Sequence, residues 1–393
     1  MYHVRRETEF VSDQPWAQIQ DFGGSPISTA QILEQTCQPA RPVWPHWEVS
    51  MRKVLTAAMA ALLATTTLGF AQPVTLKLAH FWPMGAGPHK DFTVNWTDEV
   101  TECSGGEITF EFYTAGTQLG NVTKLEDVLR AGLVDIAHGL NHLPRNRFTT
   151  ATIMDTPLLA KSAYANSMTL WTLFEEGLIS KPYDGIKVLA LHAHNAGLIH
   201  TKEKAVKAPG DLEGMRIRAP SPAAAMMLEE LGAVPVGVPP GDTYEVISKG
   251  TADGTIFPWE GVAAFKLAEI LDHSSDLKLN AASFWFAMNE NKYNSLSDSQ
   301  RKCIGDASGE KLVKQTGAYW DTWDAPGLEQ TKAEGSEIFV PDEAQQAAWT
   351  EAMQPVIAKY HESLKGAGFD NVEETYARAQ ELVEKYQAEY EAQ

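Results

Sequence analysis

Apolar residues occur in short runs along residues 73–393, and segments with helical spacing separate most of these runs. The run "TLKLAH" at 75–80 is typical of a strand. Strands are predicted at 75–80, 107–116 and 134–139, with a helix between each pair. The same order recurs later, with strands predicted at 214–220, 233–239 and 252–258 and helices at 222–232 and 242–250.

The two copies correspond even in their final turns, where "RAGLVDIAHG" matches "SKGTADGTIF". Gly132 and Gly250 fall where the end of a helix favours a left-handed residue. Asp135 and Asp253 each lead into the last strand of a copy. Each copy is thus a βαβαβ unit, which predicts a parallel sheet with helices on its faces. The predicted fold class is α/β, with two lobes and a cleft between them.

The remaining segments are predicted to link the lobes and to cover them. A hydrophobic strand within 183–201 crosses between lobes, and a second strand within 283–296 crosses back. A long helical run begins at Ser297, and the tail carries an apolar stripe of one helix that is predicted to dock on the body. The predicted lobes are 72–195 with 284–324, and 196–283 with 325–393.

The first 71 residues differ from the rest. Residues 1–50 lack periodicity and are predicted to be a non-native or disordered extension, with translation starting at Met51. Residues 51–71 have a basic start, an apolar run and small residues before the cleavage site, which predicts a secretory signal peptide and a periplasmic protein. An uncleaved membrane anchor is the alternative.

Composition narrows the range of functions. The 51 acidic against 32 basic residues give a net charge of −19, which argues against nucleic acid as a partner. No catalytic motif is present, and no cysteine spacing typical of metal sites, so no metal or cofactor is predicted. Cys103 and Cys303 are expected to be isolated thiols, although the exported compartment permits a disulfide bridge.

The segment "GMRIRAP" places two arginines on one face of a predicted strand. Ligands of open α/β sheets bind outside the carboxyl ends of the strands, so Arg218 lies better for the cleft than Arg216. A guanidinium matches a carboxylate in bidentate geometry. Arg218 is therefore predicted to bind a ligand carboxylate, with a structural ion pair as the alternative. Arg147 is a second candidate, for which a solvated loop charge is the alternative.

The same rule selects further residues at strand ends. Aromatic side chains there could stack on a ligand, although large aromatic residues also serve simply as core. In addition to Arg218 and Arg147, the predicted ligand-binding residues are His80, Phe81, His138, Phe257 and Trp259.

Several stretches together resemble the solute receptors of TRAP transporters, the DctP-like periplasmic binding proteins. They are "LKLAHF", "AGTQLG", "LRAGLVDIAHG", "DLEGMRIRAP", "SKGTADGTIFPWE" and "MNENKYNSLSDSQ". The resemblance spans 73–393. It implies a two-lobed periplasmic binding protein fold with hinge strands and a long helix spanning both lobes. It also implies an organic acid ligand bound by Arg218, delivery to the small and large TRAP membrane subunits, and no enzymatic activity.

This chain departs from branches of that family at ligand positions. Ile256 and Phe257 stand where the sialic-acid branch has Glu and Asn, and Leu198 stands where it has a second arginine. These changes from polar to apolar predict a small monocarboxylate with an apolar or aromatic body. The alternatives are a receptor of another periplasmic uptake or sensing system, and a secreted enzyme on a two-lobed scaffold.

Overall fold

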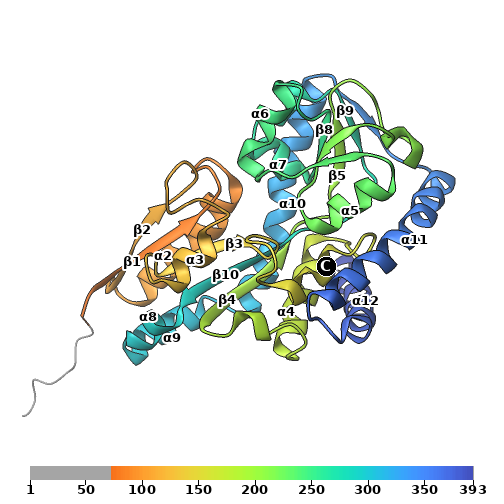
Figure 1. Ribbon diagram of the computed structural model, residues 1–393. Helices are drawn as coiled ribbons and strands as arrows, with labels where there is room; N and C mark the ends of the chain where they lie inside the picture. Colours follow the sequence, from red (N-terminus) through yellow and green to blue (C-terminus); the bar gives the residue numbers. More distant parts are fainter. Residues whose placement is uncertain (1–71, 393) are drawn as a thin grey trace, which may run out of the picture. The chain divides into compact units, whose positions relative to one another are not determined.

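The computed structural model describes residues 72–392, which fall within one compact unit of the chain, Gly69–Gln393. The predicted extension at 1–50 and the predicted signal peptide at 51–71 lie outside the described residues, so both stay predictions. Two β-sheets with flanking helices make up the described part (Figure 1).

The first sheet has five strands in the order β2-β1-β3-β10-β4, and the lobe built on it is called the first lobe. Strands β1, β2 and β3 are parallel, and β10 runs antiparallel to both of its neighbours. The strands are Val74–His80 (β1), Ile108–Tyr113 (β2), Ile136–Leu140 (β3), Ile186–Ala193 (β4) and Ser283–Asn289 (β10). The central strands β3 and β10 are buried along their whole length, as expected of strands covered on both faces.

The second sheet has six strands in the order β11-β9-β5-β8-β6-β7 and forms the second lobe. Its strands are Leu198–Thr201 (β5), Arg216–Arg218 (β6), Val234–Val236 (β7), Gly254–Phe257 (β8), His273–Ser275 (β9) and Glu337–Phe339 (β11). The parallel part β7-β6-β8 has the same order as β2-β1-β3 in the first lobe. The predicted duplication of a βαβαβ unit is therefore confirmed.

Identical contacts explain why the two copies share their last turn. The helices of the two units are Asn95–Cys103 (α2), Leu125–Arg130 (α3), Pro222–Glu230 (α5) and Thr243–Ser248 (α6). Gly132 and Gly250 both have φ of +69°, which lets the chain leave α3 and α6. The side chains of Asp135 and Asp253 then accept hydrogen bonds of 2.8 Å from the backbone N–H groups of Lys77 and Arg216. Each aspartate thus fastens the last strand of its unit to the first.

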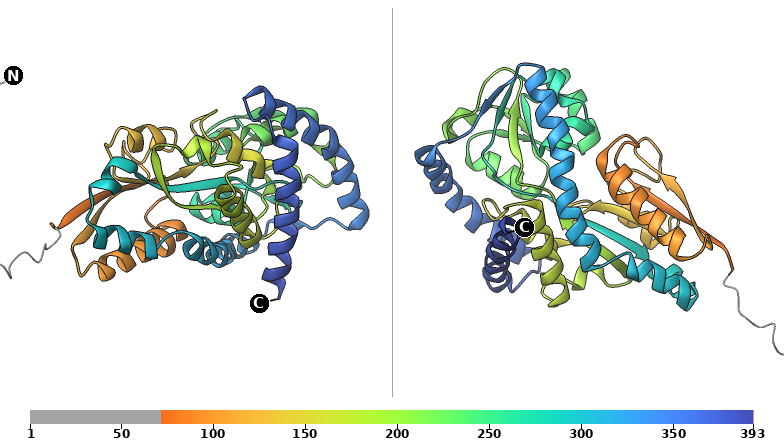
Figure 2. Two further views of the ribbon diagram at one scale, coloured as in Figure 1. Left: turned by 90° about the horizontal axis from the view of Figure 1, so that it is seen from below. Right: turned by 180° about the vertical axis from the view of Figure 1, so that it is seen from behind.

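Three segments pass between the lobes: two crossings near the strands that the sequence predicts within 183–201 and 283–296, and the long helix that the family resemblance implies. β4 leads into β5, β9 leads back into β10, and helix α10 (Glu310–Ala333) contacts α4 and β4 of the first lobe and α7 of the second. α4 is Ala163–Glu175 and α7 is Trp259–Ala264. Figure 2 shows α10 as the long light-blue helix beside both sheets. Gly327 permits the close crossing, since a Cβ there would lie 1.9 Å from the Trp259 carbonyl oxygen.

The C-terminal helices α11 (Glu343–Gly366) and α12 (Val372–Glu391) correct the predicted lobe boundaries. The sequence assignment put 325–393 in the second lobe, but α12 packs on α4 of the first lobe. The apolar stripe of α12, including the buried Val372, Ala379 and Val383, joins the core of the first lobe. The periodicity identified the docking face of α12, whereas the identity of its partner depends on the tertiary fold.

Cys103 and Cys303 form a disulfide that links the end of α2 to α9 (Asp298–Asp306) in the first lobe. The expectation of two isolated thiols is therefore wrong. Their separation of 200 residues hid the pairing, because the chain leaves this lobe and returns between them. Within 72–392, no helix has the length and apolar character that a membrane crossing requires.

Candidate functional site

A cavity of about 40 Å³ lies where the carboxyl ends of strands from both sheets meet. The lining residues come from both lobes and are mostly aromatic or apolar. They are Phe81, Trp82, Leu140, His142, His194, Arg218, Pro220, Pro240, Ile256, Phe257, Pro258, Glu260, Phe265, Asn280, Ala282, Phe284 and Trp320. This is the position that the strand-end rule predicts for a ligand site.

Arg218, the last residue of β6, is 1% exposed. Its Nε donates to the Val238 carbonyl oxygen at 3.2 Å and its Nη1 donates to that of Ile256 at 3.4 Å. The Phe257 ring lies 4.5 Å from the guanidinium carbon. Among the described residues no carboxylate forms an ion pair with Arg218. It is therefore a buried cation held by neutral groups, and a buried charge without an opposite charge is costly.

A structural ion pair was the alternative role considered for Arg218, but it is Arg216 that forms one. Its guanidinium binds both carboxylate oxygens of Asp253 and the carbonyl oxygen of Gly250, and the side chain is 46% exposed. Since alternate residues of a strand lie on the same face, the two arginines differ by depth along β6 rather than by face. Arg216 is exposed at the start of β6, whereas Arg218 lines the cavity at the end of the strand.

Burial sets the charge of the cavity. Burial lowers the pKa of Arg218 to about 9, an effect that Asp242 partly offsets, so the guanidinium stays protonated at pH 7. Burial also lowers the pKa of His142 to about 3 and that of His194 to about 4. Burial, followed by the nearby Asp324, raises the pKa of Glu260 to about 8. At neutral pH the cavity lining therefore carries one charge, that of Arg218.

Two other predicted residues line the cavity and four, including Arg147, lie elsewhere. Phe81 and Phe257 belong to the lining. Trp259 begins α7, is partly buried, and packs edge-on against His200 at 5.0 Å between ring centroids. His80 and His138 do not line the cavity and lie buried in the first lobe. His80 hydrogen-bonds to His89 at 2.8 Å, and His138 to His192 at 2.6 Å.

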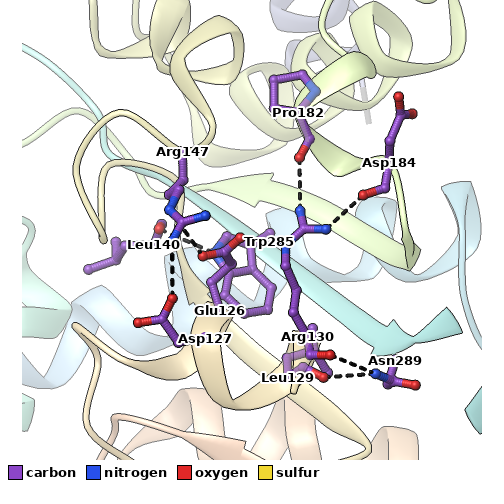
Figure 3. Close-up of polar contacts among 10 residues, drawn as sticks. All are labelled: Glu126, Asp127, Leu129, Arg130, Leu140, Arg147, Pro182, Asp184, Trp285 and Asn289. Carbon is purple, nitrogen blue, oxygen red and sulfur yellow. Dashed lines mark hydrogen bonds and ion pairs between the residues drawn. The ribbon is translucent and has the colours of Figure 1, made fainter. Parts of the chain in front are cut away.

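Arg147 is not among the residues that line the cavity. Figure 3 shows its contacts with Glu126 and Asp127 instead. Its Nη2 is 3.2 Å from Asp127 Oδ1 and its Nε is 3.6 Å from Glu126 Oε2, so it pairs with helix α3. Glu126 binds Arg130 as well, and Arg130 donates to the carbonyl oxygens of Pro182 and Asp184. The half-exposed Arg147 side chain thus belongs to a network that ties its loop to α3.

Several lining residues were not predicted as ligand-binding residues. Trp82 directly follows the predicted Phe81, so the strand-end rule points to it. Three more lining residues lie where β4 and β10 join the segments that cross between the lobes: His194, Ala282 and Phe284. The predicted crossings were therefore the only indication in the sequence that these residues lie near the cleft. Trp320 lies on α10, and nothing in a long helical run distinguishes this tryptophan from others in the core. Among residues 72–392 no cluster of three metal-binding side chains occurs.

Comparison with known proteins identifies the family. The sequence profile described as bacterial extracellular solute-binding protein, family 7 (DctP), matches residues 78–363. A TRAP solute-binding protein from a marine metagenome, described as specific for aromatic acids and bound to 3-hydroxybenzoate, is 33% identical. The match covers 80% of this chain and 99% of that one, with a TM-score of 0.77.

Two further solved structures give the same architecture. A TRAP solute-binding protein from Rhodoferax ferrireducens with copurified benzoate is 30% identical, with a TM-score of 0.76. One from Bordetella bronchiseptica with bound (R)- and (S)-mandelate is 27% identical, with a TM-score of 0.72. Each match covers 80% of this chain and 99% of the other. The chain belongs to the bacterial extracellular solute-binding proteins of family 7 and is a TRAP solute-binding receptor rather than an enzyme.

Proposed function

We propose that this receptor binds a small monocarboxylate with an aromatic body, with the carboxylate on Arg218 and the ring among the aromatic side chains. The observation that carries the proposal is the buried guanidinium, without an ion-pair partner among the described residues, in a cavity lined mostly by aromatic and apolar side chains. A carboxylate supplies the opposite charge and the fork-shaped acceptor that a guanidinium matches. The rings of Trp82, Phe284 and Trp320 offer flat apolar surfaces to an aromatic ring.

The charge of the cavity disfavours a dicarboxylate or a sugar acid. A second carboxylate would lose its hydration without gaining a second cation, because His142 and His194 are neutral. The several hydroxyls of a sugar would meet a lining that is mostly aromatic or apolar, including Ile256 and Phe257. The three solved relatives described above also hold aromatic acids as their ligands.

Uptake is proposed to proceed by closure of the lobes about the crossing segments, followed by delivery to the small and large TRAP membrane subunits. The cavity takes side chains from both lobes, so a ligand in it contacts both and stabilises the closed form through contacts that the open form lacks. Export to the periplasm is proposed from the predicted signal peptide. The Cys103–Cys303 disulfide is consistent with export, because disulfides form and persist in oxidising compartments such as the periplasm.

A thermal-shift screen of the purified receptor tests the ligand class. Benzoate, hydroxybenzoates and mandelate are expected to raise the melting temperature, because a ligand that binds only the folded state stabilises it. Succinate, glucuronate and sialic acid are expected to leave it unchanged. Stabilisation by succinate or sialic acid, with the aromatic acids inert, would overturn the proposal.

A further inference from the structure

Glu260 is an acidic side chain inside a cavity proposed to receive an anion. It lies in the first turn of α7, is 6% exposed and lines the cavity. Its Oε1 is buried and has no hydrogen-bond partner among the described residues. Buried polar atoms of native proteins nearly always have a partner, so this oxygen calls for one.

The surroundings of Glu260 supply no such partner. The nearest acid is Asp324 of α10, whose Oδ1 accepts from the Glu260 backbone N–H at 2.7 Å and whose Oδ2 accepts from Asn195 at 2.8 Å. Both oxygens of Asp324 thus already accept hydrogen bonds. No ion pair joins Glu260 to Arg218 within the described part of the chain.

Glu260 and Arg218 both line the cavity, and two neighbouring pockets that share no lining residue adjoin it beside them. Glu260 also borders a neighbouring pocket beside α10 that Trp323 and Lys90 line. Beside Arg218, His142 and Pro220 border a separate pocket that includes Val238, the residue whose carbonyl oxygen binds Arg218. A ligand whose carboxylate rests on Arg218 can therefore extend toward Glu260.

We propose that Glu260 determines specificity by hydrogen-bonding a hydroxyl group on the ligand, at the end away from the carboxylate. The preferred ligand is then a hydroxylated aromatic acid rather than an unsubstituted one. This inference rests on the proposed function, since it assumes an aromatic acid on Arg218. A carboxyl group whose pKa is raised to about 8 is uncharged at pH 7, so it does not repel the anionic ligand and both donates and accepts hydrogen bonds.

Calorimetry at pH 7 tests the inference with benzoate and the three hydroxybenzoate isomers. At least one isomer is expected to bind wild-type receptor about 3- to 10-fold more tightly than benzoate, which is the usual contribution of one hydrogen bond. In Glu260→Met, which keeps the length of the side chain and removes its polar atoms, that preference is expected to vanish. Glu260→Gln keeps a donor and an acceptor and is expected to retain part of it.

A ligand-side comparison keeps the test independent of whether Glu260→Met folds. The methyl ether of the preferred isomer has no hydroxyl hydrogen and is expected to bind wild-type receptor no better than benzoate. Equal binding of benzoate and every isomer, or a preference that survives in Glu260→Met, would overturn the role of Glu260 alone. Failure of all aromatic acids to bind would overturn the proposed function itself.

Discussion

At the residue scale, the two arginines of β6 provide a matched pair for testing the carboxylate site. Arg218→Ala is expected to weaken binding of the aromatic acid by at least about 2 kcal/mol, or about 30-fold, because the carboxylate would then be buried without an opposite charge. Calorimetry measures the loss. A change of only a few-fold would contradict the assignment of Arg218.

Arg216→Ala is the control for that measurement. Its guanidinium pairs with Asp253 and is 46% exposed, so its removal is expected to leave ligand affinity unchanged. The loss in stability is expected to stay below about 1 kcal/mol, as for other exposed ion pairs. An effect on affinity equal to that of Arg218→Ala would show that the loss reflects general damage to β6.

Sequence reasoning distinguished these two arginines because strand position alone separates them. It selected Phe81 and Phe257 on the same ground, and both line the cavity. The rule misplaced His138, because a side chain at a strand end can face the core between sheet and helix instead of the cleft. Glu260 and Trp320 reach the cavity from helices, where no strand-end rule applies.

At the element scale, the duplication was predictable because its contacts are local to each unit. Gly132 and Gly250 end equivalent helices, and Asp135 and Asp253 fasten equivalent strands. The docking of α12 on α4 and the disulfide were not predictable, since each joins segments far apart in the sequence. Such pairings follow from the tertiary fold: periodicity marks which face of α12 is buried, but not the helix on which it packs.

The disulfide yields a prediction at this scale. Cys103→Ser with Cys303→Ser is expected to lower the free energy of unfolding by about 2–4 kcal/mol, as typical disulfides contribute. Ligand affinity is expected to stay unchanged, because neither cysteine lines the cavity and both helices pack in one lobe. Urea unfolding and calorimetry of the double variant measure the two quantities. An unchanged unfolding midpoint, or a large loss of affinity, would contradict this account.

At the scale of the whole molecule, the repeated βαβαβ unit was enough to predict an α/β protein with two lobes. The segments outside the two repeats were predicted to cross between the lobes. The assignment of the tail did not follow, because an amphipathic helix can cover either lobe. Burial of histidine is likewise a property of the assembled fold. Eight histidines are buried with lowered pKa values: His80, His89, His138, His142, His192, His194, His200 and His361.

These histidines predict how stability depends on pH. Five have pKa values lowered by burial to about 3 or 4 from 6.5, so between pH 6.5 and pH 4 the unfolded chain takes up protons that the folded protein does not. Each such histidine costs up to about 1.4 kcal/mol per pH unit as the pH falls through this window. Above pH 6.5 these histidines are neutral in both states and their effect disappears.

Buried carboxyl groups act in the opposite direction. The pKa values of Asp155, Asp276, Glu260 and Asp324 are all raised, chiefly by burial, so the folded state binds protons more tightly at these groups and gains stability as the pH falls. They are fewer than the buried histidines, and Glu260, with a pKa of about 8, exerts part of its effect above pH 6.5. Stability is therefore expected to be greatest near pH 6.5–7 and to fall below pH 6. Urea midpoints measured from pH 8 to pH 4.5 test this, and a midpoint that stays level or rises down to pH 5 would show that the buried histidines do not outweigh the buried carboxyl groups.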